Sequence, residues 1–93
     1  VEITGNSMEP TLEDGEFALV DPDNTAYSKN KIYVVTYNDE GYIKRLEMNN
    51  KLKLITLKSD NPDYEDIDIP EEMQEYFTVN GRVVEVISKK KLL

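Results

Sequence analysis

The chain has 93 residues, a length that provides for one domain and leaves no room for a second. With 19 acidic against 11 basic residues its net charge is −8, so its electrostatic field repels a polyanion such as DNA. It contains no cysteine and no histidine, which excludes disulfides, thiolate chemistry and a histidine general base. The longest apolar runs, residues 17–20 and 32–35, fall far below the roughly 20 residues that cross a bilayer, so we expect no membrane partner. Any catalysis must therefore use serine, lysine, tyrosine or carboxylate side chains.

Composition favours a β-sheet fold, because valine, isoleucine and threonine total 21 while alanine, the best helix former, occurs only at positions 18 and 26. Short apolar stretches bounded by turn residues predict, in chain order, strands at Glu16–Asp21, Ile32–Tyr37, Tyr42–Met48, Lys51–Lys58 and Phe77–Ile87. Hairpin turns at Asn38–Gly41 and Asn49-Asn50 would join the middle three strands into a meander. A short helical turn is expected over Glu71–Phe77, after Pro70. We therefore predict one all-β, mostly antiparallel domain over residues 1–93.

The segment Asp60–Glu75 holds eight acidic residues and no basic one. A calcium loop is one interpretation, but an EF-hand needs acids at alternate positions, glycine at the sixth and glutamate at the twelfth, and this order is interrupted here. We expect a solvated acidic loop and no metal site. The lysine-rich tail Ser88–Leu93 is expected to be a frayed end.

Residues 5–12 carry a pattern that suits a reactive serine. Gly5 loosens the backbone, while Pro10 fixes its own φ and biases Glu9 toward extended geometry. Such a turn can present Ser7 rigidly beside backbone N–H groups, as a nucleophile with an oxyanion site requires. For a lone serine, an ordinary turn residue is the simpler interpretation.

A nucleophilic serine needs a base, and Lys44 is the candidate. In an extended strand, Lys44 shares a face with Leu46 and Met48, and burial there would lower its pKa toward values at which the amine accepts a proton. The opposite face, with Ile43, is also partly apolar. The pattern therefore leaves open whether Lys44 is buried or is a surface lysine on an amphipathic strand.

Together these residues form an ordered set of motifs: Gly5-x-Ser7-Met8-x-Pro10-Thr11-Leu12, Asp14-Gly15, Lys44-Arg45-Leu46, Ser59-Asp60-Asn61-Pro62-x-Tyr64 and Gly81-Arg82-Val83-Val84. The set resembles the C-terminal domain of LexA-like self-cleaving repressors, a family of serine–lysine peptidases that includes phage CI-type repressors and UmuD polymerase subunits. The resemblance runs from Gly5 to about Ile87 and implies the β-clip fold of that domain.

The resemblance also implies roles for individual residues. Ser7 matches the nucleophile, which would attack an Ala-Gly or Cys-Gly bond in a linker, and Lys44 matches the general base. Backbone N–H groups near Ser7 and Met8 would form the oxyanion hole, with Gly5 and Pro10 shaping the turn. The loop Ser59–Tyr64 would be structural and close to the dyad, with Asp60 as a turn-maker. No cofactor or metal is implied.

The partners implied are a second copy of the chain, the protein's own linker as substrate, and a RecA–single-stranded DNA filament that promotes cleavage. The final strand, Phe77–Ile87, would lie at the two-fold interface and pair there by its edge. DNA would be bound only through an N-terminal domain, which together with the linker we expect to be absent from this chain. We expect the protein to be cytoplasmic.

Two other functions fit parts of the pattern. In the first, the domain is a non-cleaving dimerisation module of a phage-type repressor whose site is vestigial. The second is a type I signal peptidase, which shares the Ser-Met-x-Pro segment and a lysine base. That class needs a membrane anchor and an apolar membrane-facing surface, which the acidic composition and short apolar runs disfavour.

Overall fold

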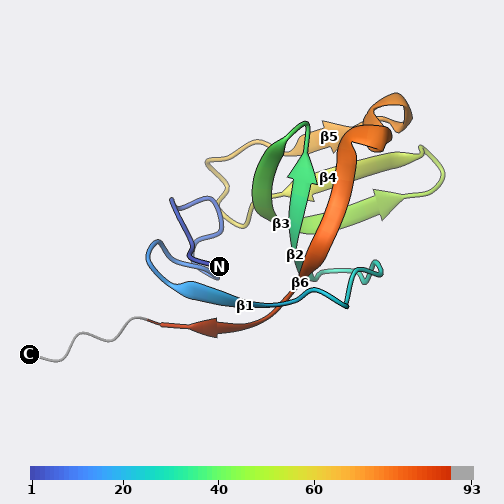
Figure 1. The fold of residues 1–93 in the computed structure, drawn as a ribbon. Helices are drawn as coiled ribbons and strands as arrows, with labels where there is room; N and C mark the ends of the chain where they lie inside the picture. Colours follow the sequence, from blue (N-terminus) through green and yellow to red (C-terminus); the bar gives the residue numbers. More distant parts are fainter. Residues whose placement is uncertain (89–93) are drawn as a thin grey trace, which may run out of the picture.

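The computed structural model describes residues 1–88, which form one antiparallel sheet with a single short 3-10 helix (Figure 1). The elements are β1 (Phe17–Asp21), β2 (Ile32–Tyr37), β3 (Glu40–Asn49), β4 (Leu54–Lys58), β5 (Ile67–Ile69), η1 (Glu71–Tyr76) and β6 (Phe77–Ile87). The strand order in the sheet is β1-β6-β2-β3-β4-β5. The all-β, antiparallel prediction is therefore confirmed, and so is the meander of β2, β3 and β4.

The turn between β2 and β3 lies at Asn38 and Asp39, whose φ angles are 50° and 67°. Two consecutive positive φ values are typical of the type I′ turn, whose twist matches that of a two-residue hairpin. Gly41, which was predicted to belong to the turn, instead pairs with Thr36 inside the hairpin.

The turn between β3 and β4 is longer than predicted, because β4 begins at Leu54 rather than at Lys51. Asn49 accepts a hydrogen bond from the Leu52 N–H at 3.0 Å, and Lys53 has a φ of 51°. This local bonding holds residues 50–53 in a turn, so Asn49 pairs with Leu54. The predicted two-residue turn at Asn49-Asn50 would have produced a different register between β3 and β4.

The acidic segment differs from the prediction of a solvated loop. Ile67–Ile69 forms strand β5, which pairs with β4, and Ile69 is fully buried. The predicted helical turn is present as η1 and contains no buried residue. Most of the predicted tail lies outside the described residues; Ser88 itself donates a hydrogen bond to Glu16.

Strand β6 lies inside the sheet, and the prediction that it pairs as an edge strand is wrong. Its first half pairs with β2 and its second half with β1, with Arg82 opposite a residue of each. A Cβ at Gly81 would lie 2.7 Å from the Asp21 carbonyl oxygen and from Cγ1 of Val20. Only glycine therefore allows the end of β1 to approach β6 this closely.

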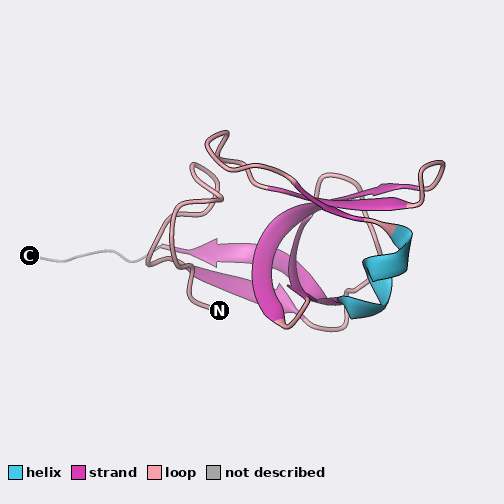
Figure 2. Cartoon of the chain, turned by 90° about the horizontal axis from the view of Figure 1, so that it is seen from above, coloured by secondary structure: helices cyan, strands magenta, loops and turns pink. Residues whose placement is uncertain are grey.

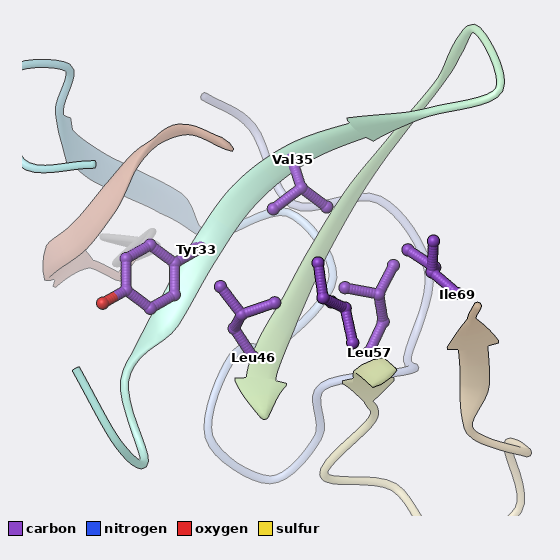
Figure 3. Packing of buried hydrophobic residues seen from close by; sticks show 6 residues of the cluster. Tyr33, Val35, Leu46, Leu57 and Ile69 are labelled. Carbon is purple, nitrogen blue, oxygen red and sulfur yellow. The ribbon is translucent and has the colours of Figure 1, made fainter. Parts of the chain in front are cut away.

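The sheet curls around a first hydrophobic cluster, with η1 at the end away from β1 (Figure 2). The buried members of this cluster are Tyr33, Val35, Leu46, Ile55, Leu57 and Ile69, which come from β2 to β5 (Figure 3). A second cluster lies beneath the N-terminal segment and contains Ile3, Met8, Leu12, Ala18 and Ile32. The second cluster anchors residues 3–12 to β1 and β2.

Within residues 1–88, no helix is long and apolar enough to cross a membrane.

Candidate active site

The turn that carries Ser7 is anchored on both sides of the serine. Met8 and Leu12 are 2% and 1% exposed in the second cluster, and the Leu12 N–H donates to the Met8 carbonyl at 2.9 Å. Before the serine, Gly5 has a φ of +84° and donates its N–H to Asp14 Oδ1 at 2.7 Å. The positive φ is readily adopted by glycine, as the motif suggested. The Glu9–Pro10 peptide bond is cis.

Lys44 lies in β3 directly opposite Tyr33 of β2, and its side chain is buried, with the residue 7% exposed. Leu46 is 2% exposed and Met48 packs against the first cluster, so the face that Lys44 shares with these residues is the inner one. Ile43 packs against the second cluster instead. The choice that the sequence left open is therefore settled in favour of a buried lysine.

Ser7 and Lys44 line one cavity of about 430 Å³ between the N-terminal segment and the β2–β3 hairpin. Apolar side chains, among them Ile3, Met8 and Ile43, form much of its remaining wall. Such a cavity can hold a short peptide segment with one side chain in apolar surroundings.

The Lys44 amine has one polar partner among residues 1–88, because Nζ donates to Ser59 Oγ at 2.7 Å. Nζ also lies 5.6 Å from the centroid of the Tyr64 ring. No carboxylate forms an ion pair with Lys44 in the described part of the chain. Burial lowers the pKa of Lys44 below its usual value of 10.5, since a buried ammonium loses hydration without a compensating negative charge.

Asp60 joins the strand of the lysine to the turn of the serine. Its carboxylate accepts hydrogen bonds from Arg45 Nε at 2.7 Å and Nη2 at 3.0 Å, and another from the Thr11 hydroxyl. The Arg45 hydrogen bond is the main cause that lowers the pKa of Asp60. The prediction that Asp60 is a turn-maker is therefore wrong, because its oxygens bind side chains from distant parts of the chain.

The turn-making residue of this loop is Asn61, which accepts a hydrogen bond from the Asp63 N–H at 3.0 Å. Asn61 also donates its own N–H to the Ser7 carbonyl and its side-chain amide to the Asn6 carbonyl, both at 3.0 Å. Tyr64 donates its hydroxyl to Asn6 Oδ1. The loop Ser59–Tyr64 thus packs directly on the Ser7 turn, close to both candidate residues as expected.

Sequence reasoning missed the contacts of Ser59, Arg45 and Thr11. The missing signal was the register of β3 and β4. Arg45 pairs with Lys58, so Lys44, which precedes Arg45, lies beside Ser59, which follows the last residue of β4. A two-residue turn at Asn49-Asn50 would have placed Lys44 opposite Ile55 instead. Within residues 1–88, no group of three or more acidic side chains is arranged to hold a metal ion.

Known proteins related to this chain include a peptidase family and a phage protein. A family model described as "Peptidase S24-like" matches residues 1–84. A "26 kDa repressor protein" of Escherichia phage HK022 is 33% identical over 85 residues, which is 90% of this chain and 35% of the phage protein. The chain thus spans about a third of the length of this relative.

Proposed function

Because this chain belongs to the peptidase S24-like family, we propose that it is the self-cleaving and dimerising domain of a LexA/CI-like transcriptional repressor. The phage relative is itself named a repressor. The observation that carries the peptidase proposal is that Ser7 and a buried Lys44 line the same cavity. A serine at an anchored turn beside a lysine of lowered pKa is the pairing that a serine–lysine dyad needs.

In the proposed reaction, neutral Lys44 takes the proton of the Ser7 hydroxyl as Oγ bonds to the carbonyl carbon of a linker peptide bond. The C–N bond then breaks, and Lys44 gives that proton to the leaving amine. Water hydrolyses the resulting ester, with Lys44 accepting a proton from the water and Ser7 Oγ recovering it. The products are two peptide fragments and an unchanged dyad.

The negative charge that develops on the carbonyl oxygen would be stabilised by the N–H groups of Ser7 and Met8. Neither N–H donates to a protein acceptor within the described residues 1–88, whereas the Glu9 N–H donates to the Asn6 carbonyl. Two free donors next to a nucleophile are the usual form of an oxyanion hole. The sequence expectation of an oxyanion hole near Ser7 and Met8 is thus retained as part of the proposal.

The test is cleavage of the repressor chain that carries this domain together with its linker. Ser7→Ala, Lys44→Ala and Lys44→Arg should each abolish the cut, the last because a guanidinium keeps its proton. Lys58→Arg, an exposed lysine of β4, is the matched control and should cut normally. The wild-type rate should rise with pH through the titration of Lys44 and level off above it, because only the neutral amine is a base.

A cut that survives Ser7→Ala or Lys44→Arg would overturn the dyad. The bond from Nζ to Ser59, rather than to Ser7, is the observation that favours the second candidate, a non-cleaving dimerisation module. Intact wild-type chain at alkaline pH, with the fold preserved, would establish that candidate.

Dimerisation is proposed on a separate surface. Strands β1 and β6 expose the apolar side chains of Leu19, Val84 and Ile87, each about half accessible. Several exposed apolar residues on two paired strands of a small domain are typical of a contact surface. Sedimentation should show a dimer at micromolar concentration, and Leu19→Glu should weaken it. A wild-type species of 10.7 kDa well above that concentration would contradict the proposal.

A further inference from the structure

We propose that Ser59 is a positioning residue for the base, because its hydroxyl holds the Lys44 amine so that the nitrogen lone pair is directed toward Ser7. The inference rests on the proposed function and deepens it. Nothing in the motif pattern assigned this role to Ser59.

The cavity separates the roles of the two serines that lie near Lys44. Ser7 and Lys44 both line the cavity, whereas Ser59 does not. A peptide in the cavity therefore meets Ser7, while Ser59 reaches the reaction only through its hydrogen bond of 2.7 Å to Nζ. Ser59 is thus placed to orient the base rather than to attack the substrate.

The Ser59 hydroxyl is held in place by the residues that follow it. Asp60 is tied to Arg45, the neighbour of Lys44, and to Thr11 in the serine turn. Asn61 donates to the Ser7 carbonyl. Because these bonds fix the loop against both partners of the dyad, the hydroxyl is preorganised and does not have to be ordered during the reaction.

A neutral amine has two N–H donors and one lone pair. When one N–H is donated to Ser59, rotation about the Cε–Nζ bond is restricted, and the lone pair is free for the Ser7 proton. The same hydroxyl also accepts from the charged ammonium, and more strongly. Among residues 1–88, other titratable or charged groups near Lys44 are Glu2 and Tyr42 at the cavity, Tyr33 opposite Lys44 on β2, the ring of Tyr64, and the Arg45–Asp60 pair.

Loss of the Ser59 hydroxyl should therefore have two effects. The rate at high pH should fall because the amine is no longer oriented. The midpoint of the pH–rate profile should also fall, because the ammonium loses its acceptor and the neutral form is favoured. A role limited to loop structure would lower the rate without this downward shift of the midpoint.

The experiment compares pH–rate profiles of cleavage for the repressor chain and its variants. Ser59→Ala should lower the plateau about tenfold or more and move the midpoint down by about one pH unit. Ser59→Thr, which keeps a hydroxyl, should restore most of the plateau rate and most of the midpoint. Ser28→Ala, outside the cavity lining, is the control and should match the wild type. A wild-type profile in Ser59→Ala, or a lowered plateau with an unmoved midpoint, would overturn the inference.

An NMR titration of the Lys44 side chain in the 93-residue chain, in a Ser7→Ala background, separates this inference from the proposed function. Adding Ser59→Ala should lower the pKa of Lys44 whether or not the protein cleaves. If the repressor chain never cuts but this shift is seen, the proposed function fails and the Ser59–Lys44 coupling is supported. If the chain cuts and the Lys44 pKa does not move, the proposed function stands and the positioning role is refuted.

Discussion

Replacement of Asp60 by alanine removes the carboxylate that joins β3 to the serine turn. The Asp60 side chain is 15% exposed and its partner Arg45 is 33% exposed, so the pair is largely shielded from water. The substitution breaks two hydrogen bonds from Arg45 and one from Thr11. It also leaves the guanidinium without its counter-charge while Arg45 Nη1 still donates to the Asn30 carbonyl.

A hydrogen bond to a charged group contributes about 1.5 to 3 kcal/mol to stability, and a broken buried ion pair costs more. A third of the Arg45 side chain is open to water, which can replace part of the lost hydrogen bonding. We therefore expect a loss of stability near the lower end of this range. The free energy of unfolding should fall by about 2 kcal/mol at pH 7, and Tm by about 10 °C for a domain of this size.

The effect should depend on pH in one direction. The pKa of Asp60 is lowered in the folded state, chiefly by the Arg45 hydrogen bond, so its contribution is fully present above the usual carboxylate value of 3.8. The contribution is lost as pH falls through the lowered pKa, because the unfolded chain binds a proton at a higher pH than the folded state does, and this uptake stabilises the unfolded chain. The stability difference between wild type and Asp60→Ala should therefore shrink at acidic pH.

Urea denaturation of both proteins at pH 7 and at about pH 3 measures this difference. Asp66→Ala is the control, because Asp66 pairs with Lys58 at 3.4 Å and both side chains are nearly half exposed. We expect no resolvable change for the control. The stabilising role of Asp60 is refuted if Asp60→Ala is no less stable than Asp66→Ala at pH 7, or if its loss of stability relative to wild type does not shrink at acidic pH. In either case Asp60 does not stabilise the contact between β3 and the serine turn.

Three further predictions follow from burial and close contacts. Lys44→Met should raise the free energy of unfolding at pH 7, because it removes a buried ammonium. The unfolded chain holds the Lys44 proton more tightly than the folded state does, so the gain should shrink as pH rises toward 10.5. A gain that stays constant with pH in urea titrations would contradict a buried, partly desolvated ammonium. Gly81→Ala should cost about 1 to 3 kcal/mol because its Cβ would collide with Asp21 and Val20, whereas Gly41→Ala, with no atom within 4 Å of the new Cβ, should be tolerated. Ile69→Ala should cost about 2 to 5 kcal/mol in thermal unfolding if β5 belongs to the core, and a near-zero change would show that it does not.

Much of the fold was predictable because it depends on local pattern. The excess of β-branched residues over alanine and the short apolar stretches indicated an all-β domain, and β2 has the predicted bounds, Ile32–Tyr37. Strand β5 was missed because Ile67 and Ile69 stand among acids that conceal a three-residue strand. The prediction of a solvated loop overlooked strand alternation, in which Asp68 points outward while the isoleucines on either side of it face the core.

The site was predictable in its two central residues and not in their surroundings. Ser7 and Lys44 were chosen from motif and chemistry, and the structure brings both to one cavity. The partners of Lys44 and Asp60 depend on the β3–β4 register, which the predicted Asn49-Asn50 turn set incorrectly. A change of a few residues in the length of a hairpin turn changes every cross-strand neighbour. An error in predicting the turn therefore prevents the contacts between the two strands from being predicted.

The sequence by itself determined the fold class, the strand order of the meander and the family, because the first two depend on residue composition and local pattern and the third on a set of motifs in a fixed order along the chain. Only the tertiary structure decided that Lys44 is buried, since both faces of its strand are partly apolar and burial depends on what packs against each. The interior position of β6 likewise follows from two distant strands that each pair with one half of it. Asp60 bonds to residues 15 and 49 positions away, a separation that no local pattern encodes and that only strand register and core packing close.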